Sequence, residues 1–228
     1  MGVCRLLLLT ALFLLTYTVS ADPDMLQDLC VADLSSRNSL SLSLYFFMRS
    51  VRVNGFTCKA NITADDFFFA GIGNPGLTNN SMGALVTGAN VQRIPGLNTL
   101  GVSLARIDYA PGGLNPPHTH PRATEVVFVL EGQLDVGFIT TANVLISKTI
   151  KQGDVFAFPK GLVHFQKNNG MVPAAVISAF NSQLPGTQSI ATTLFAATPP
   201  VPDNVLAKAF MVGTEEVQEV KSRFAPKS

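Results

Sequence analysis

The sequence predicts an all-β protein, an antiparallel sandwich or barrel, from two observations. Short runs rich in valine, isoleucine and phenylalanine recur after residue 100, and each is bounded by glycine, proline, asparagine or aspartate. No helical pattern separates them, which argues against a parallel sheet with crossover helices. The runs span residues 101–110, 125–132, 133–140, 143–150, 154–159 and 174–181, within a barrel core that we place at residues 100–198.

Two turn signals lie between neighbouring runs of this core. Glu131 and Gly132 predict a tight hairpin turn before residue 133, and the Pro-Lys-Gly sequence at residues 159–161 predicts another turn. About 200 residues follow the first segment of the chain, enough for one β-rich domain with a substantial core.

The first segment, residues 1–21, predicts a signal peptide. Arg5 supplies a positive charge, an apolar run follows, and Ser20 and Ala21 offer a cleavage position before Asp22. The alternative is a membrane anchor, but the run is shorter than the ~20 residues that a spanning helix needs. We therefore expect a secreted protein with no membrane span after signal removal.

Residues 22–99 predict an N-terminal extension and wrapping loops around the barrel. An alternation of serine and leucine at residues 39–44 indicates a half-buried strand. Residues 65–96 are rich in glycine, asparagine and proline, which indicates a loop that wraps over the core.

Residues 199–228 predict a helical extension. Residues 203–210 form a short candidate helix, and residues 214–225 a longer one with Thr214 as N-cap. Acidic residues in its first turn and basic residues in its last turn complement the helix dipole. Its apolar stripe is narrow, so we expect it to pack on its own barrel or on a neighbouring subunit.

The charge balance excludes a nucleic-acid or acidic-membrane partner. The chain has 16 basic and 15 acidic residues, and removal of the signal peptide with Arg5 leaves the two signs equal. Charged residues make up 14% of the chain, against a typical ~25%. Such a low content favours a protein that hides part of its surface in an oligomer.

The cysteines and sequons fit an exported chain. Cys4 leaves with the signal peptide, so Cys30 and Cys58 remain, and in an oxidising compartment they form one disulfide or stay as two free or intermolecular thiols. A disulfide here would stabilise the fold by roughly 3–4 kcal/mol in the chain-entropy model. Asn61 and Asn79 begin N-glycosylation sequons.

All three histidines of the chain fall in two short motifs. His118 and His120 stand two apart in a proline-rich extended segment, so both side chains point to one face. Glu125 starts the next apolar run, and His164 follows the later turn. A barrel could bring these four residues together. The alternative is a surface turn, a solvated strand end and an isolated histidine.

Three imidazoles and one carboxylate form a nitrogen and oxygen donor set. Such a set suits Mn²⁺, Fe²⁺, Ni²⁺, Cu²⁺ or Zn²⁺ better than a metal that prefers thiolates. Four protein ligands on an octahedral ion leave two positions open, which a catalytic metal requires. The histidines and Glu125 therefore predict a metal site.

These motifs resemble the two cupin motifs, and more closely those of the germins and germin-like proteins. The first is filled by Gly112, His118, His120, Glu125 and Gly132, and the second by Gly153, Asp154, Pro159, Gly161, His164 and Asn168. Residues 26–34 and 53–59 resemble the N-terminal germin boxes that carry the two cysteines. The resemblance extends from Asp22 to the C-terminus.

The resemblance implies a secreted protein of the plant extracellular matrix. It implies a jelly-roll β-barrel with a helical C-terminal extension and a Cys30–Cys58 disulfide. It places manganese, Mn²⁺, on the three histidines and Glu125. It also implies a homo-hexamer, a trimer of dimers in which the helices clasp the neighbouring subunit.

The implied activity is an oxidoreductase that makes hydrogen peroxide. Some germins oxidise oxalate, and many relatives dismutate superoxide. In the oxalate-oxidising members two asparagines line the pocket: one aligns with Asn115, but the other aligns with Ala105, which cannot hydrogen-bond a bound dicarboxylate. This difference favours superoxide dismutase, with Asn115 as an orienting catalytic group or, alternatively, a turn residue. The alternatives are oxalate oxidase and a non-enzymatic cell-wall or receptor-like binding protein.

One segment departs from the germin pattern. The link between the two cysteines is longer here, and the excess coincides with Ser36–Ser50. It is either a genuine insertion or unspliced intron sequence. A genuine insertion is tolerated at low cost, because loop-closure entropy grows slowly with length.

Overall fold

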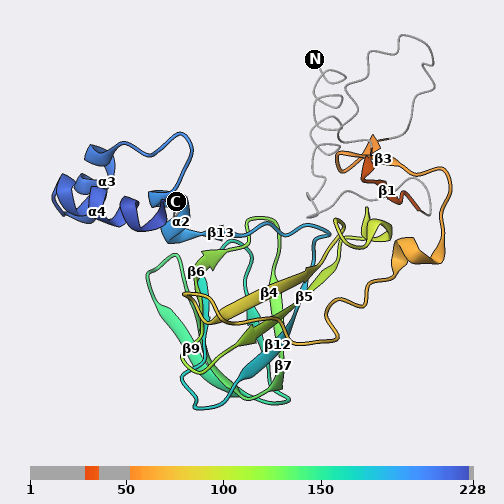
Figure 1. Ribbon diagram of the computed structural model, residues 1–228, viewed down its shortest axis with the longest axis horizontal. Helices are drawn as coiled ribbons and strands as arrows, with labels where there is room; N and C mark the ends of the chain where they lie inside the picture. The colour runs from red at the N-terminus through yellow and green to blue at the C-terminus, as the bar shows by residue number, and fades with distance from the viewer. Residues whose placement is uncertain (1–28, 36–51, 226–228) are drawn as a thin grey trace, which may run out of the picture.

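The protein folds into two five-stranded antiparallel sheets that face each other, with a small N-terminal sheet at one end and helices to one side (Figure 1). The computed structural model describes residues 29–35 and 52–225. The predicted signal peptide, the serine and leucine alternation and Ser36–Ser50 therefore lie outside the described residues. In the described ranges, no helix is long and apolar enough to cross a membrane.

The first sheet has the strand order β10-β7-β12-β5-β4, and its strands all pair antiparallel. Their bounds, in that order, are Val155–Phe158, Glu125–Glu131, Ala174–Phe180, Ser103–Tyr109 and Ala84–Ala89. Burial alternates along β7, where Val127 and Val129 are buried while Val126 and Phe128 are exposed. This period of two is the pattern of a sheet with one face on the core.

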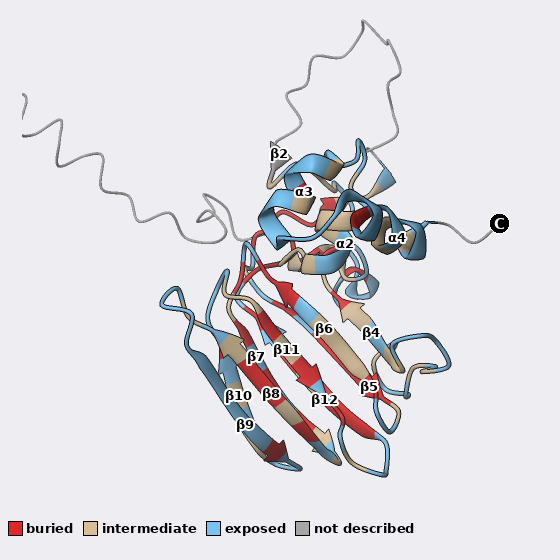
Figure 2. Ribbon diagram, turned by 90° about the vertical axis from the view of Figure 1, so that its left-hand side faces the viewer, coloured by how far each residue is buried: buried red, intermediate tan, exposed pale blue. Residues whose placement is uncertain are grey.

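The second sheet has the order β13-β6-β11-β8-β9. Its strands span Gln188–Ser189, Leu114–Thr119, His164–Lys167, Gln133–Ile139 and Leu145–Lys151. The inner faces of both sheets contribute to one core of Ile107, Tyr109, Val127, Val129, Leu134, Val136, Ile150, Phe158, Ala174 and Val176. Figure 2 shows buried positions, in red, along the strands of the barrel. The all-β prediction is confirmed.

The predicted hairpin at Glu131 and Gly132 is wrong. Strand β7 pairs with β10 and β12, whereas β8 pairs with β9 and β11, so the chain crosses from one sheet to the other at Gly132. Gly132 has φ +74°, and an added Cβ would lie 2.7 Å from the Pro173 carbonyl oxygen. Only glycine fits this sharp corner, and a turn signal alone does not specify which strands pair.

The wrapping loop predicted for residues 65–96 contains a core strand. Strand β4 pairs with β5 along its whole length, and two short 3₁₀ helices, η2 (Ala64–Phe67) and η3 (Pro95–Leu97), flank it. The glycine- and asparagine-rich segments on both sides of β4 conceal it in the sequence. The barrel therefore begins before residue 100.

Helices α2 (Ile190–Phe195), α3 (Asp203–Phe210) and α4 (Thr214–Phe224) follow the barrel. Helix α2 was not predicted, and helical structure starts before residue 199. The N-cap of α4 is Gly213 rather than Thr214, which is the first helical residue. Aromatic contacts of Phe195 with Phe210 and Phe224 hold the three helices together.

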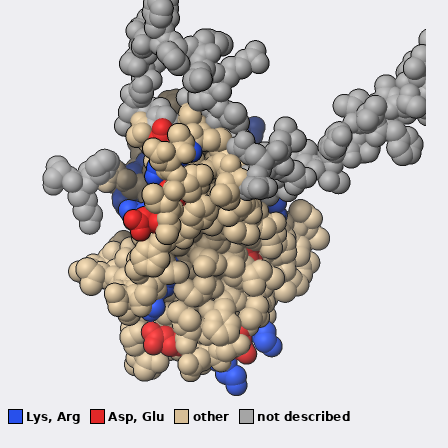
Figure 3. All heavy atoms as spheres, turned by 90° about the vertical axis from the view of Figure 1, so that its right-hand side faces the viewer, with Lys and Arg blue, Asp and Glu red and all other residues tan. Residues whose placement is uncertain are grey.

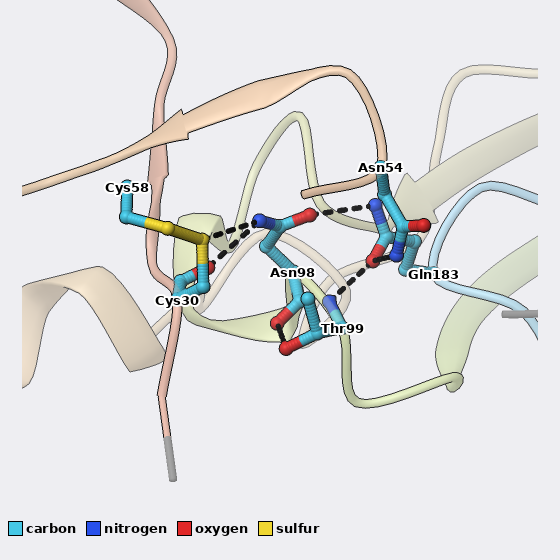
Figure 4. The surroundings of a disulfide bond; sticks show 6 residues. All are labelled: Cys30, Asn54, Cys58, Asn98, Thr99 and Gln183. Atoms are coloured by element: carbon cyan, nitrogen blue, oxygen red, sulfur yellow. Dashed lines mark hydrogen bonds between the residues drawn. A yellow bond between two sulfur atoms is a disulfide. The ribbon is translucent and has the colours of Figure 1, made fainter. Parts of the chain in front are cut away.

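The N-terminal sheet has the order β1-β3-β2, with strands Ala32–Asp33, Phe56–Cys58 and Arg52–Val53. The Cys30–Cys58 disulfide staples it, as predicted. Figure 4 shows the buried Asn98 beside this disulfide, where its amide donates to the Cys30 carbonyl over 2.7 Å. The extension is thereby joined to the segment that leads into β5.

Candidate metal centre

The fold brings the three histidines and Glu125 together inside the barrel. His118 is the penultimate residue of β6. His164 is the first residue of β11 and pairs directly with His118. Glu125 is the first residue of β7 in the facing sheet. All four residues are at most 5% exposed, and one donor atom from each lies within 4.8 Å of the others. The predicted convergence is confirmed.

Backbone carbonyls orient the three imidazoles. The Nδ1 atoms of His118, His120 and His164 contact the carbonyl oxygens of Pro116, Gly186 and Leu162 over 2.7, 2.5 and 2.8 Å. A carbonyl only accepts, so each Nδ1 carries a proton, and each Nε2 points to the centre, where it would present its lone pair to a bound metal. This is the tautomer that a metal ligand needs, and such outer contacts fix the ring orientation.

The two oxygens of the Glu125 carboxylate have different partners. Oε1 accepts from the Ser178 hydroxyl over 2.7 Å and from the Gln166 amide over 3.2 Å. Oε2 lies 2.9 Å from Nε2 of His164 and 3.1 Å from Nε2 of His120. Lone-pair atoms this close require a proton or a cation between them.

The charge state of the centre follows from burial and contacts. Burial raises the pKa of Glu125, but hydrogen bonding with His120 and His164 outweighs it and holds the pKa well below its ordinary value of 4.5. Burial, with His164 nearby, lowers the pKa of His118 to about 4. At neutral pH the site therefore holds a carboxylate beside a neutral imidazole.

Within the described residues, no lysine or arginine forms an ion pair with Glu125. A buried carboxylate without a cationic partner is costly, and a bound divalent ion removes that cost. Both cysteines of the described chain are used in the disulfide, so the donor set is nitrogen and oxygen only. The residues fit a first-row divalent cation.

Gln166 is a site residue that the sequence reasoning missed. It is fully buried, and its Oε1 accepts from the Asn115 amide over 2.7 Å and from the Tyr109 hydroxyl over 3.2 Å. Burial and the Glu125 charge raise the pKa of Tyr109, which keeps this hydroxyl protonated as a donor. Gln166 stands two residues after His164, and that spacing on one strand face was the available signal.

A cavity of about 110 Å³ opens beside the ligands. Asn115, the predicted catalytic residue, and Ala105 both line it, together with His118, His120, Glu125, Ser103, Ile107, Phe180, Pro185 and Thr187. Asn115 is thus placed at the cavity, with its amide directed to Gln166. Ala105 contributes only a methyl group to the wall.

The predicted glycosylation residues lie outside the centre. Asn61 follows the N-terminal sheet and Asn79 lies in the segment before β4, and both are exposed. Exposure is what an oligosaccharide acceptor needs, and neither residue lines the cavity.

Known proteins are similar to this chain in sequence and in fold. The chain matches the cupin family over residues 70–218. It is 68% identical over 226 residues to germin-like protein subfamily 2 member 1 of Arabidopsis thaliana, covering 96% of this chain and 97% of that protein. It is 69% identical over 206 residues to a rhicadhesin receptor of Pisum sativum, covering 90% and 89%.

Among solved structures, a recombinant oxalate oxidase in complex with glycolate is similar with a TM-score of 0.80 and 44% identity. The match covers 90% of this chain and 98% of that chain. The family match and the sequence relatives together give the assignment. The chain belongs to the germin-like proteins of the cupin family.

Proposed function

We propose that this germin-like protein is a manganese-dependent superoxide dismutase that produces hydrogen peroxide outside the cell. The observation that carries the proposal is the cluster of three imidazoles and one carboxylate beside a small cavity whose wall includes Ala105. When bound, manganese would supply one-electron chemistry between Mn²⁺ and Mn³⁺, so that two superoxide ions and two protons give dioxygen and hydrogen peroxide.

The residues of the chain supply the surroundings of that reaction. His118, His120, Glu125 and His164 would hold the ion. Asn115 lines the cavity, and Gln166 links Asn115 to Glu125 by hydrogen bonds. A diatomic anion needs little space, and a cavity of about 110 Å³ provides for it. Most of the cavity wall is apolar, which limits water around the ligands.

Ala105 supports superoxide over oxalate as the substrate. It is 4% exposed and lies on the inner face of β5, at the cavity. Oxalate-oxidising germins carry an asparagine at the aligned position, which can donate to a dicarboxylate. The methyl group of Ala105 would leave one carboxylate oxygen of bound oxalate without a hydrogen-bond donor. Such an unpaired buried polar group costs about 1–3 kcal/mol of binding free energy.

Extracellular location and assembly form part of the proposal. The disulfide suits an oxidising compartment, and the exposed Asn61 and Asn79 would be glycosylated there. Figure 3 shows a face of the molecule with few charged side chains. Apolar side chains are exposed on the outer face of the first sheet, at Leu104, Val126, Phe128 and Val155. They are also exposed on α3, at Val205 and Phe210, and at its C-cap residue Met211. Such surfaces would be buried in a hexamer.

The test is a pair of assays on one sample. Purified protein is analysed for its metal, then assayed for superoxide consumption and for peroxide release from oxalate. We expect bound manganese, fast superoxide consumption and no oxalate-dependent peroxide. Metal-free protein with neither activity would refute the enzymatic proposal.

Oxalate oxidase is the second candidate, favoured by the similarity to the solved oxalate oxidase. Peroxide release from oxalate at a rate above that of the metal alone would make oxalate oxidase the first candidate in place of superoxide dismutase. A receptor-like binding role is the third candidate, favoured by the name of the similar Pisum sativum protein. It would be supported by an inactive protein that still carries the folded barrel.

A further inference from the structure

We propose that Arg122, an exposed residue outside the cavity wall, is a positioning residue for the metal ligand His120. It acts by holding the carbonyl of Gly186 against the imidazole. The inference rests on the metal-binding part of the proposed function and does not depend on the reaction that the metal supports.

The only orienting contact of the His120 ring nitrogen Nδ1 within the described residues comes from Gly186. His118 and His164 each contact a carbonyl two residues earlier on their own segment. His120 instead contacts the Gly186 carbonyl, 66 residues away in the sequence. The orientation of His120 therefore depends on where a separate loop is held.

Arg122 holds that loop with two hydrogen bonds. Its side-chain Nε donates to the Leu184 carbonyl over 2.8 Å, and its backbone N–H donates to the Pro185 carbonyl over 3.3 Å. These two acceptors immediately precede Gly186. Because Arg122 is only two residues after His120, the same short segment carries both the ligand and the anchor of the group that orients it.

The guanidinium also packs directly over Gly186. Gly186 has φ +69°, and a Cβ built on it would lie 2.6 Å from Nη2 and 3.0 Å from Cζ of Arg122. The absence of a side chain at residue 186 thus lets the guanidinium approach the backbone closely. Hydrogen bonds and packing together restrict the loop at the position where its carbonyl meets His120.

The other end of the loop is anchored to the N-terminal extension. The Gln183 carbonyl accepts from the Val91 N–H over 3.1 Å, and the Gln183 amide donates to Asn98 over 2.9 Å beside the disulfide (Figure 4). Residues 184 and 185, which Arg122 holds, therefore lie between the buried anchor at Gln183 and the pairing of Gln188 with Thr119. Loss of the Arg122 side chain would remove the hydrogen bond to Leu184 and the packing on Gly186, while the backbone hydrogen bond to Pro185 would remain.

The test compares three substitutions at Arg122 by titration with Co²⁺. The visible absorption of bound Co²⁺ reports the geometry of its ligands, so the readout does not require activity. Arg122→Gln places an amide nitrogen at the chain position of Nε and keeps the donor without the charge. Arg122→Met removes the donor, and Arg122→Lys keeps the charge but moves the donor by one bond.

We expect Arg122→Met to weaken Co²⁺ binding about tenfold, at the lower end of the effect of outer contacts on metal affinity, and to change the absorption spectrum. Arg122→Gln should stay close to the wild type in both, and Arg122→Lys should fall between them. Melting temperatures measured without metal check that all variants fold. If Arg122→Met does not fold, the inference is tested by comparing the other two variants: Arg122→Gln should bind Co²⁺ more tightly than Arg122→Lys.

Two results would overturn the inference. One is an Arg122→Met protein with wild-type affinity and spectrum. The other is an Arg122→Gln protein as impaired as Arg122→Met, or more impaired than Arg122→Lys, since charge rather than the placed donor would then matter. A wild-type protein that binds no Co²⁺ would instead refute the metal site itself, and the positioning role with it.

Discussion

The side-chain amide of Gln166 donates to Oε1 of Glu125 over 3.2 Å, although the two residues belong to strands of opposite sheets. This bond and the Ser178 hydroxyl occupy Oε1. They leave Oε2 facing the imidazoles of His120 and His164. The carboxylate is thereby held in one rotamer before any cation binds.

The first prediction follows from that bond. Gln166→Leu should lower Mn²⁺ affinity at least tenfold, because contacts behind a ligand typically contribute a factor of 10–100. Tyr109 and Asn115 would also lose their common acceptor. Electron paramagnetic resonance of free Mn²⁺ during a titration measures the affinity. Gln152→Leu, at an exposed glutamine, is the control, and equal affinities for the two variants would contradict the prediction.

The second prediction concerns the ligands. His120→Ala should lose most of the bound metal and any superoxide-consuming activity, while the barrel still folds, because the core of the two sheets does not include His120. Metal analysis after dialysis, with a circular dichroism spectrum, checks both parts. Metal content equal to that of the wild type would show that His120 is not a ligand.

The third prediction is acid destabilisation of the metal-free protein. The folded-state pKa of His118 is lowered from 6.5 to about 4, so between these values the unfolded chain binds more protons than the folded one. The contribution of His118 to the free energy of unfolding should therefore fall as the pH is lowered from about 6.5 and level off near 4. The contribution of His118 is on the order of 3 kcal/mol.

Chemical denaturation of metal-free protein at several pH values measures this slope. The depressed pKa of Glu125 acts in the same direction at lower pH, since its contribution is lost as pH falls below 4.5. His118→Gln, which cannot titrate, should show a shallower slope above pH 4.5. A wild-type slope identical to that of His118→Gln would contradict the assignment.

The fourth prediction tests the substrate. Ala105→Asn should bring an amide donor into the cavity and strengthen oxalate binding about tenfold or more, because hydrogen bonds to charged groups contribute about 1.5–3 kcal/mol. Oxalate-dependent peroxide release, and its KM, measure the gain. Ala105→Leu adds volume without a donor and serves as the control. Equal oxalate kinetics in the two variants would show that residue 105 does not select the substrate.

The fifth prediction concerns the link to the disulfide. Asn98→Leu should lower the free energy of unfolding by about 2–6 kcal/mol, because the Cys30 carbonyl and the Gln183 amide each lose Asn98 as a partner in a buried position. Chemical denaturation measures the change. Asn204→Leu, at an exposed position of α3, should have little effect. A similar loss in both variants would contradict the role of Asn98.

Local patterns in the sequence predicted much of the barrel and the four clustered residues. The strands containing Val127 and Val176 were predicted from β-branched residues and turn boundaries, because these are local properties of the chain. His118 and His120 were predicted to share a face, since side chains alternate along a strand. The sequence left open whether Cys30 and Cys58 form a disulfide or stay as free or intermolecular thiols, and the structure shows the disulfide.

Other features could not be predicted because they depend on pairing between distant segments. The turn at Gly132 was identified, but the chain changes sheets there instead of forming a hairpin. Strand β4 was missed because its partner, β5, is what makes it a strand. Gln166 lay beside a predicted ligand, but its function depends on Glu125 in the other sheet.

The sequence by itself determined the all-β class, the two ligand motifs and the donor chemistry, since residue type and spacing decide what a strand can present to one face. The tertiary structure alone decided which atoms meet: Oε1 of Glu125 with Gln166, and Nδ1 of His120 with Gly186. Hydrogen bonds act over about 3 Å. Contacts so short exist only after folding has placed residues tens of positions apart in the chain against one another.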